Sequence, residues 1–285
     1  MFPDITRRRR TAWQAAALAV AIAGGEAHAD SRLDAHYSVS VAGIAIGKTD
    51  VNVVIGGAEY TSSASGRASG MLRALVTGEG TLSARGAVVD GRLVPASFSS
   101  STTGDDEKSA VTMTIDGGDV KTLTAETSAP AADRVPVTDD HRKGIVDPLS
   151  GLLVRVGGAS EVVAADACQR TLQIFDGRRR FDLTLSFKRI EQVKAAKGYA
   201  GPAAVCAVAF KALAGHRPGS PLVKYLGGGR DIELTLAPIA GTRMLAPFRL
   251  SIANMLGNMV VEATAFETST TPDTRAALSP ATTTR

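Results

Sequence analysis

Apolar and polar residues alternate with a period of two over much of this 285-residue chain, most clearly at residues 181–190. The odd-numbered positions there are apolar, namely Phe181, Leu183, Leu185 and Phe187. The even-numbered positions are polar, namely Asp182, Thr184, Ser186 and Lys188. Such a strand buries one face and exposes the other to water. The preceding Asp176-Gly177 pair is typical of a tight turn, because glycine adopts positive φ without steric cost. Residues 171–190 are therefore predicted to form a β-hairpin.

Further alternating segments surround this hairpin, and turn signals such as Asp90-Gly91 and Asp116-Gly117-Gly118 separate several of them. The other predicted strands are 33–52 (two strands broken at Gly43), 59–65, 81–89, 93–101, 110–115, 120–127, 205–213, 231–236, 244–252 and 259–266. Many short strands joined by tight turns are typical of antiparallel β architectures. The predicted fold class is mostly β, an antiparallel open barrel or β-spiral with one short plugging helix.

That helix is predicted after residues 129–146, a charged stretch with two prolines that we interpret as a crossover loop. Asp147 is a good N-cap, and Pro148 at the first helical position sacrifices no hydrogen bond. Apolar residues then recur at helical spacing until Gly157-Gly158: Leu149, Leu152, Leu153 and Val156. We expect the helix to cover one open end of the sheet, with Leu149, Leu152 and Leu153 as candidate ligand-binding residues. The alternative is a plain core helix without a ligand role.

The N-terminal residues have the layout of a secretory signal peptide. Four arginines, Arg7 to Arg10, precede a short apolar run at 12–24, and Ala27-His28-Ala29 matches a cleavage site. We therefore predict that 1–29 is removed on export and that the protein is periplasmic. Residues 30–267 are predicted to form one β-rich domain. Residues 268–285, rich in Thr, Ser, Pro and Ala, are predicted to be a disordered tail.

The charge of the chain argues against nucleic acid as a partner. The predicted signal peptide holds four arginines and two acidic residues, so its removal lowers the formal net charge from +4 to +2. Binding to nucleic acid requires a clustered basic face, which so small a charge does not favour. No later segment is long and apolar enough to predict a transmembrane anchor after cleavage. No pattern in the sequence indicates an oligomeric state.

The two cysteines, Cys168 and Cys206, predict a disulfide, because an exported chain folds in an oxidising compartment. They are expected on the first and third strands of the meander that contains the central hairpin. Closing this loop would contribute about 4 kcal/mol on the chain-entropy view of cross-links. The alternative is a pair of buried free thiols.

The hairpin turn carries three consecutive arginines, Arg178, Arg179 and Arg180. They are candidate partner-binding residues, because a cationic tip fits a phosphate or a lipopolysaccharide. The alternative is a solvated hairpin tip, and the flanking Asp176 and Asp182 dilute its positive field.

Motifs for catalysis are weak in this sequence. Three histidines follow the predicted signal peptide, His36, His141 and His216, and none has the spacing of a metal-ligand pair. No nucleophile elbow of the G-x-S-x-G type is found, and the glycine clusters lack the remaining residues of nucleotide-binding loops. We therefore predict a non-enzymatic protein with no cofactor and no metal. A hydrolase would require His141 or His216 to meet a carboxylate and a hydroxyl.

Several stretches together resemble a large uncharacterised family of exported proteobacterial proteins, a domain-of-unknown-function family. They are Tyr37 to Val39 with Ala42 to Gly47, Asp147-Pro148-Leu149-Ser150 with Leu152-Leu153, Cys168, Phe175 to Asp182, Tyr199 and Cys206. The layout is more loosely similar to periplasmic β-spiral envelope-integrity proteins and to the half-barrel lipoprotein carriers of the Lol system. This similarity implies a spiral or open barrel and a role in envelope maintenance, with no catalytic residue to carry over.

The leading hypothesis is a periplasmic protein that binds a lipid, a lipoprotein or an envelope polypeptide and supports the integrity of the cell envelope. The alternative is a structural or interaction protein without a small-molecule ligand, which acts through a sheet edge or the basic hairpin tip.

Overall fold

The computed structural model describes residues 30–68, 78–103, 108–127, 133–158, 161–229, 231–253 and 257–271, and the predicted signal peptide lies outside them. The main strands are β1 (Asp30–Val41), β2 (Ile44–Ile55), β3 (Glu59–Ala68), β4 (Glu79–Val89), β5 (Arg92–Thr103), β6 (Lys108–Asp116), β7 (Asp119–Thr127), β9 (Arg170–Phe175), β10 (Arg180–Lys194), β12 (Ala200–Ala214), β13 (Ile232–Pro238), β14 (Met244–Ile252) and β15 (Met259–Thr271). Two short strands, β8 (Val154–Arg155) and β11 (Lys197–Gly198), pair with β14 and β15. The predicted strands are thus present, several of them longer than expected.

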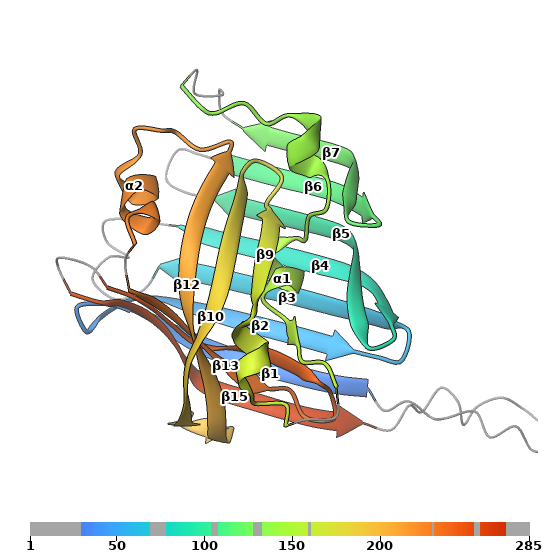
Figure 1. Cartoon of the computed structure of the whole chain (residues 1–285), viewed down its shortest axis with the longest axis vertical. Helices are drawn as coiled ribbons and strands as arrows, with labels where there is room; N and C mark the ends of the chain where they lie inside the picture. Colours follow the sequence, from blue (N-terminus) through green and yellow to red (C-terminus); the bar gives the residue numbers. More distant parts are fainter. Residues whose placement is uncertain are drawn as a thin grey trace, which may run out of the picture.

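All these strands belong to one sheet, in the order β7-β6-β5-β4-β3-β2-β1-β15-β14-β13-β12-β10-β9. The long neighbours are antiparallel, and β15 returns along the first strand to join the two halves of the sheet. The sheet curls strongly, so that β9, β10 and β12 run across the front of β2 to β7 (Figure 1). The fold class is therefore mostly β, a single large antiparallel sheet forming an open barrel.

The crossover between β7 and β9 holds the two outer parts of the sheet together. The amide of Ile145 donates to Gly118 O in the β6–β7 turn, at 2.7 Å. The next residue pairs with β9 instead: Val146 N donates to Gln173 O at 2.9 Å, and Val146 O accepts from Phe175 N at 3.1 Å. One extended segment thus connects elements that lie at opposite ends of the strand order.

The predicted turn at Asp176-Gly177 joins β9 and β10, and its glycine is required by packing as well as by backbone angle. Gly177 has φ +88°, and a Cβ atom there would lie 2.2 Å from a methyl carbon of Val111 on β6. The hairpin tip therefore rests against β6 and does not project into solvent.

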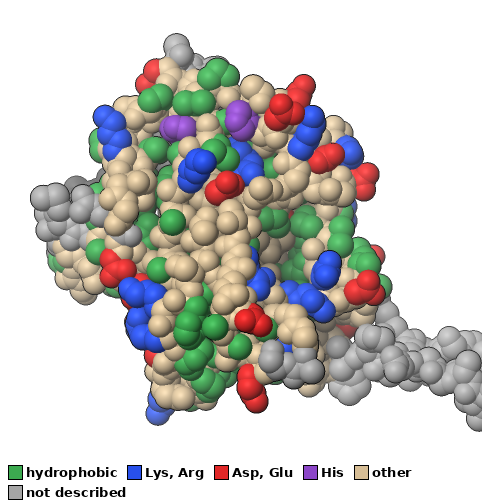
Figure 2. All heavy atoms as spheres, in the orientation of Figure 1, with side chains coloured by type: hydrophobic (Ala, Val, Ile, Leu, Met, Phe, Trp, Pro, Cys, Tyr) green, Lys and Arg blue, Asp and Glu red, His purple; other side chains and the backbone are tan. Residues whose placement is uncertain are grey.

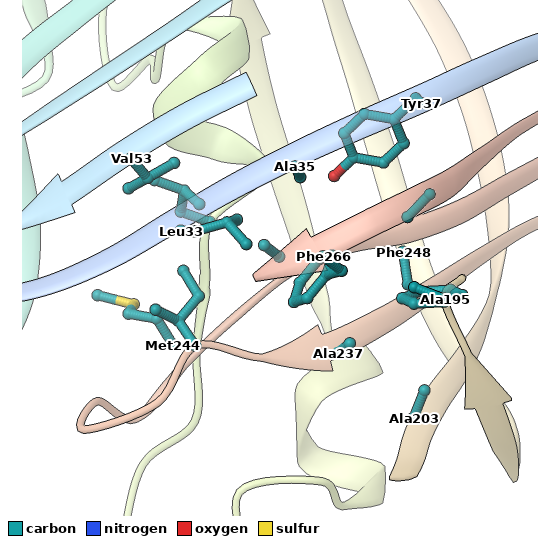
Figure 3. Packing of buried hydrophobic residues seen from close by; sticks show 14 of the residues in the cluster. Leu33, Ala35, Tyr37, Val53, Ala195, Ala203, Ala237, Met244, Phe248 and Phe266 are labelled. Carbon is teal, nitrogen blue, oxygen red and sulfur yellow. The ribbon is translucent and has the colours of Figure 1, made fainter. Parts of the chain in front are cut away.

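The inner faces of the strands supply the core. On β1, Leu33, Ala35 and Tyr37 are buried, whereas the residues between them face outward. Figure 3 shows Leu33 of β1 beside Val53 of β2 and pointing toward Phe266 of β15, and all three belong to one buried cluster with Phe248. The period-two pattern is therefore expressed as an inside and an outside of the curled sheet.

The helices differ from the prediction. The helix after the crossover, α1 (Pro148–Gly151), has only four residues, because Val154 leaves it to pair with β14. A second helix, α2 (Pro221–Gly227), was not predicted, although Ser220 caps it through Val223 N and Pro221 occupies its first position. No helix in the described part of the chain is long and apolar enough to cross a membrane.

The C-terminal boundary also differs from the prediction. Strand β15 continues to Thr271, four residues into the segment expected to be a tail, and its last residues pair with the start of β1. The remainder of that segment, 272–285, lies outside the described residues.

A disulfide joins Cys168 and Cys206, whose Cα atoms are 5.3 Å apart. Cys206 lies on β12 as expected, but Cys168 ends a short 3-10 helix, η3 (Ala165–Cys168), and not a strand. In the sheet β10 lies between β9 and β12, so cysteines on those two strands would not be neighbours. The bond forms because η3 folds back over the inner face, where both cysteines are fully buried.

Candidate ligand-binding cavity

The curled sheet encloses an apolar cavity of about 340 Å³. Its walls come from the inner faces of β1, β2, β3, β10 and β12 to β15, and its ends from residues in and near α1 and α2. The lining residues are Leu33, Tyr37, Thr49, Val51, Val53, Ser62, Leu149, Leu152, Leu153, Leu183, Val208, Phe210, Leu226, Ile232, Leu234, Ala246, Pro247, Arg249, Leu250, Ile252 and Val261. The volume is within the range of pockets that bind small molecules, about 300–1,000 Å³.

All three leucines predicted as ligand-binding candidates, Leu149, Leu152 and Leu153, line this cavity. Leu149 belongs to α1, and the other two directly follow its last residue. Sequence reasoning did not single out the rest of the wall. Alternation had placed Leu183 on the apolar face of its strand, but burial alone does not distinguish a cavity wall from a filled core.

Local hydrogen bonds fix α1 in place. One carboxylate oxygen of Asp147 accepts from Leu149 N and Ser150 N, both at 3.0 Å. Asp147 is fully buried, and burial raises the pKa of its carboxyl above the usual value. The hydroxyl of Ser150 lies 2.6 Å from that of Tyr60 on β3, so the helix is bonded to the barrel wall. Burial also raises the pKa of the Tyr60 phenol, which keeps it protonated as a hydrogen-bonding group.

Polar side chains are few in the wall, and two of them are bonded within the protein. Tyr37 donates its hydroxyl to Pro247 O at 2.6 Å. The guanidinium of Arg249 is bonded to Glu191 and lies 3.7 Å from Glu262. Among the described residues, the buried side-chain atoms without a hydrogen-bond partner include none from the cavity lining. The cavity is therefore suited to hydrocarbon.

The two ends of the cavity differ in exposure. At the α1 end, Leu33, Val53 and Leu153 are 0%, 1% and 8% exposed, and Leu149 and Leu152 are partly exposed. At the other end, Phe210, Ile252 and Leu226 are all partly exposed, and they lie near the ends of β12, β14 and α2. Figure 1 shows α2 at the edge of the barrel and α1 inside it. The end around Leu33, Val53 and Leu153 is the most deeply buried, and it is called the closed end below; the end at α2 is called the mouth.

The structure places the three arginines of the hairpin turn in different environments. Arg178 donates through one guanidinium nitrogen to the carbonyls of Ala110 and Glu126, on β6 and β7. Arg180 is buried and bonded to Phe181 O and to the carboxylate of Asp182. Arg179 is exposed at the turn. The interpretation of all three as a solvated tip is therefore wrong, because two of them bond within the protein.

The surface carries no large basic area on the face drawn in Figure 2, where basic and acidic side chains are interspersed. The histidines are also separate from the cavity. His141 bonds to its helix cap, with Nδ1 2.9 Å from Thr138 Oγ1, and neither it nor His216 lines the cavity. Across the described ranges no three His, Cys, Asp or Glu side chains gather as a potential metal site.

Fold and site together define a class of protein, an open antiparallel barrel that encloses an apolar cavity. The chain belongs to the family DUF3108, described as "Protein of unknown function (DUF3108)", whose pattern matches residues 36–264. This confirms the resemblance to a domain-of-unknown-function family. No curated protein matches the chain. Among solved structures it is similar to a beta-barrel-like protein of domain of unknown function DUF1849 from Brucella abortus. The identity is 11% and the TM-score 0.44, over 85% of this chain and 98% of that one.

Proposed function

We propose that this protein binds the acyl chain of a lipid or lipoprotein in its internal cavity. The observation that carries the proposal is the chemistry of the cavity wall, which is formed mainly by aliphatic and aromatic side chains. An acyl chain requires no hydrogen bonds and gains about 0.8 kcal/mol for each methylene removed from water.

The same chemistry disfavours an envelope polypeptide as the occupant. A peptide group buried without hydrogen bonds costs several kcal/mol, and this wall has few polar side chains to bond with it. Of the three ligand classes that the sequence suggested, the two with acyl chains fit the cavity best.

The cellular role in this proposal follows from the predicted export. A protein with a cleaved signal peptide and a disulfide acts outside the cytoplasm, where acyl chains of membrane lipids and lipoproteins are exposed during envelope assembly. We therefore propose a periplasmic, non-enzymatic role in which the protein shields an acyl chain and so supports envelope integrity.

Action through the basic hairpin tip is the weaker proposal. Only Arg179 of the three arginines is exposed, because Arg178 and Arg180 bond to neighbouring parts of the protein. A single exposed arginine gives little electrostatic attraction for an anionic partner.

Native mass spectrometry with lipid extraction, on protein purified from its own periplasm, tests the acyl-chain proposal. A co-purifying lipid or acylated species is expected. The variant Leu152→Trp, which fills the cavity, should lose the bound species. Leu222→Trp, at a position 64% exposed on α2, should retain it. A wild-type protein that carries no lipid and takes up none from added vesicles would contradict the proposal.

A further inference from the structure

We propose that the closed end of the cavity limits how far an acyl chain can enter. The helix α1 and the two leucines after it would then set the length of the chain that is bound. This inference rests on the proposed function and adds a ligand class to it: a single unbranched saturated chain of limited length that enters tail first at the α2 end.

The closed end is made by the residues that follow Asp147. Leu149, Leu152 and Leu153 all line the cavity, and Leu153 lies there with Leu33 and Val53 of the wall. Leu153 packs in the same buried cluster as these two wall residues. Leu149 and Leu152 pack against two other groups of buried residues. A tail that reaches this point meets packed side chains, and further methylenes have no space to occupy.

The position of the closed end is fixed on three sides. Asp147 binds the first two free amides of α1, and Ser150 bonds to Tyr60 on β3. The residue before Asp147, Val146, is paired on both its amide and carbonyl groups with β9. A fixed wall gives a sharp dependence on length, because close-packed interiors do not yield to one extra methylene without cost.

The cavity volume sets the scale. A methylene group occupies roughly the volume of a water molecule, about 30 Å³, so the cavity of about 340 Å³ holds on the order of ten methylenes of one chain. Affinity should therefore rise by about fourfold for each added methylene, up to chains of about twelve carbons. Longer chains should gain nothing further, because the extra carbons stay in water at the mouth, and the chain length at which the affinity stops rising is the optimum measured below.

The test is a titration of the protein with saturated fatty acids of increasing length, from six to eighteen carbons, followed by calorimetry. Leu153→Ala removes side-chain carbons at the closed end and should lengthen the optimal chain by about two carbons. Leu226→Ala removes the same atoms at the mouth. It should weaken the binding of every chain equally and leave the optimum unchanged.

Two further variants test the same inference without relying on Leu153→Ala. Leu149→Ala enlarges the closed end at a partly exposed position and should also shift the optimum, even if Leu153→Ala fails to fold. Tyr60→Phe keeps the ring but removes the bond to Ser150, so the length dependence should become less sharp.

The results separate this inference from the proposed function. If the wild type binds fatty acids but no closed-end variant shifts the optimal chain length, the closed end does not set that length, and the proposal of acyl binding stands. If the wild type binds no chain of any length, the proposed function fails and this inference with it.

Discussion

The hydroxyl of Tyr60 on β3 lies 2.6 Å from Oγ of Ser150 in α1, although 90 residues separate them in the chain. Both side chains are buried, and the side chain of Ser150 also bonds to the carboxyl of Asp147, so the three groups form one buried network. The bond between Tyr60 and Ser150 joins the N-terminal meander to the crossover segment.

Tyr60→Phe should lower the free energy of unfolding by about 1 kcal/mol, because a hydrogen bond between two buried hydroxyls is lost while Ser150 keeps its bond to Asp147. Urea denaturation measures the change. Tyr199→Phe is the matched control, since its hydroxyl donates to Pro202 O at a more exposed position and its loss should cost less. Equal losses in the two variants, or full additivity with Ser150→Ala, would show that the Tyr60 bond has no special weight.

Cys168→Ser should lower the thermal midpoint by roughly 10 °C. The disulfide closes a loop of 38 residues, which on the chain-entropy view contributes about 4 kcal/mol. Cys206→Ser should give the same midpoint, and reducing agent should bring the wild type down to it. A midpoint that stays unchanged in both variants would mean that the two thiols are not joined in solution.

The sequence predicted those parts of the fold whose signals are local. Alternation located the strands, Asp176-Gly177 located a turn, and Asp147-Pro148 located the start of α1. The predicted C-terminal end of α1 was wrong, because Val154 pairs with β14 and this non-local contact overrides the helical spacing of the leucines. The signal for α2 was also local, since Ser220-Pro221 repeats the cap-and-proline pattern of Asp147-Pro148.

The cavity was only partly predictable, because most of its wall depends on contacts between residues far apart in the sequence. Leu149, Leu152 and Leu153 could be named because they share a helical pattern, and all three line the cavity. The opposite wall and the mouth depend on how far the sheet curls, which no local pattern records. The role of Arg178 was missed because its acceptors, Ala110 and Glu126, lie on strands far away in the sequence.

Asp147→Asn should change how the stability of the protein depends on pH. Burial raises the pKa of this carboxyl above its ordinary value of 3.8, so the folded protein binds the proton more tightly than the unfolded chain does. The resulting stabilisation is complete below about pH 4 and declines as the pH rises through the raised pKa. Asparagine does not titrate, so the variant should gain stability relative to the wild type between pH 4 and neutrality.

Urea midpoints for the wild type and the Asp147→Asn variant, measured at intervals of pH, give this difference directly. Asp140 offers a control, because it is an exposed carboxyl whose pKa is lowered by its hydrogen bond to Lys143. Asp140→Asn should not gain stability over the same interval. A constant difference between the wild type and Asp147→Asn at every pH would refute the assignment of a raised pKa to Asp147.

Arg178→Ala should destabilise the fold by about 2 kcal/mol, because hydrogen bonds from a charged donor to the carbonyls of Ala110 and Glu126 are lost. Arg179→Ala changes the same kind of residue at the next position, where the side chain is exposed, and should have an effect below about 0.5 kcal/mol. Thermal or urea unfolding distinguishes the two. If both variants were as stable as the wild type, the contact of the hairpin with β6 and β7 would not contribute to stability.

This difference decides how the basic tip can be tested as a partner-binding site. Replacing all three arginines by serine would remove the bonds that hold the hairpin to β6, β7 and Asp182, so a loss of partner capture would follow from damage to the fold. Arg179→Ser alone leaves those bonds in place. Capture of an anionic partner that survives this single change would therefore show that the hairpin tip is not its binding site.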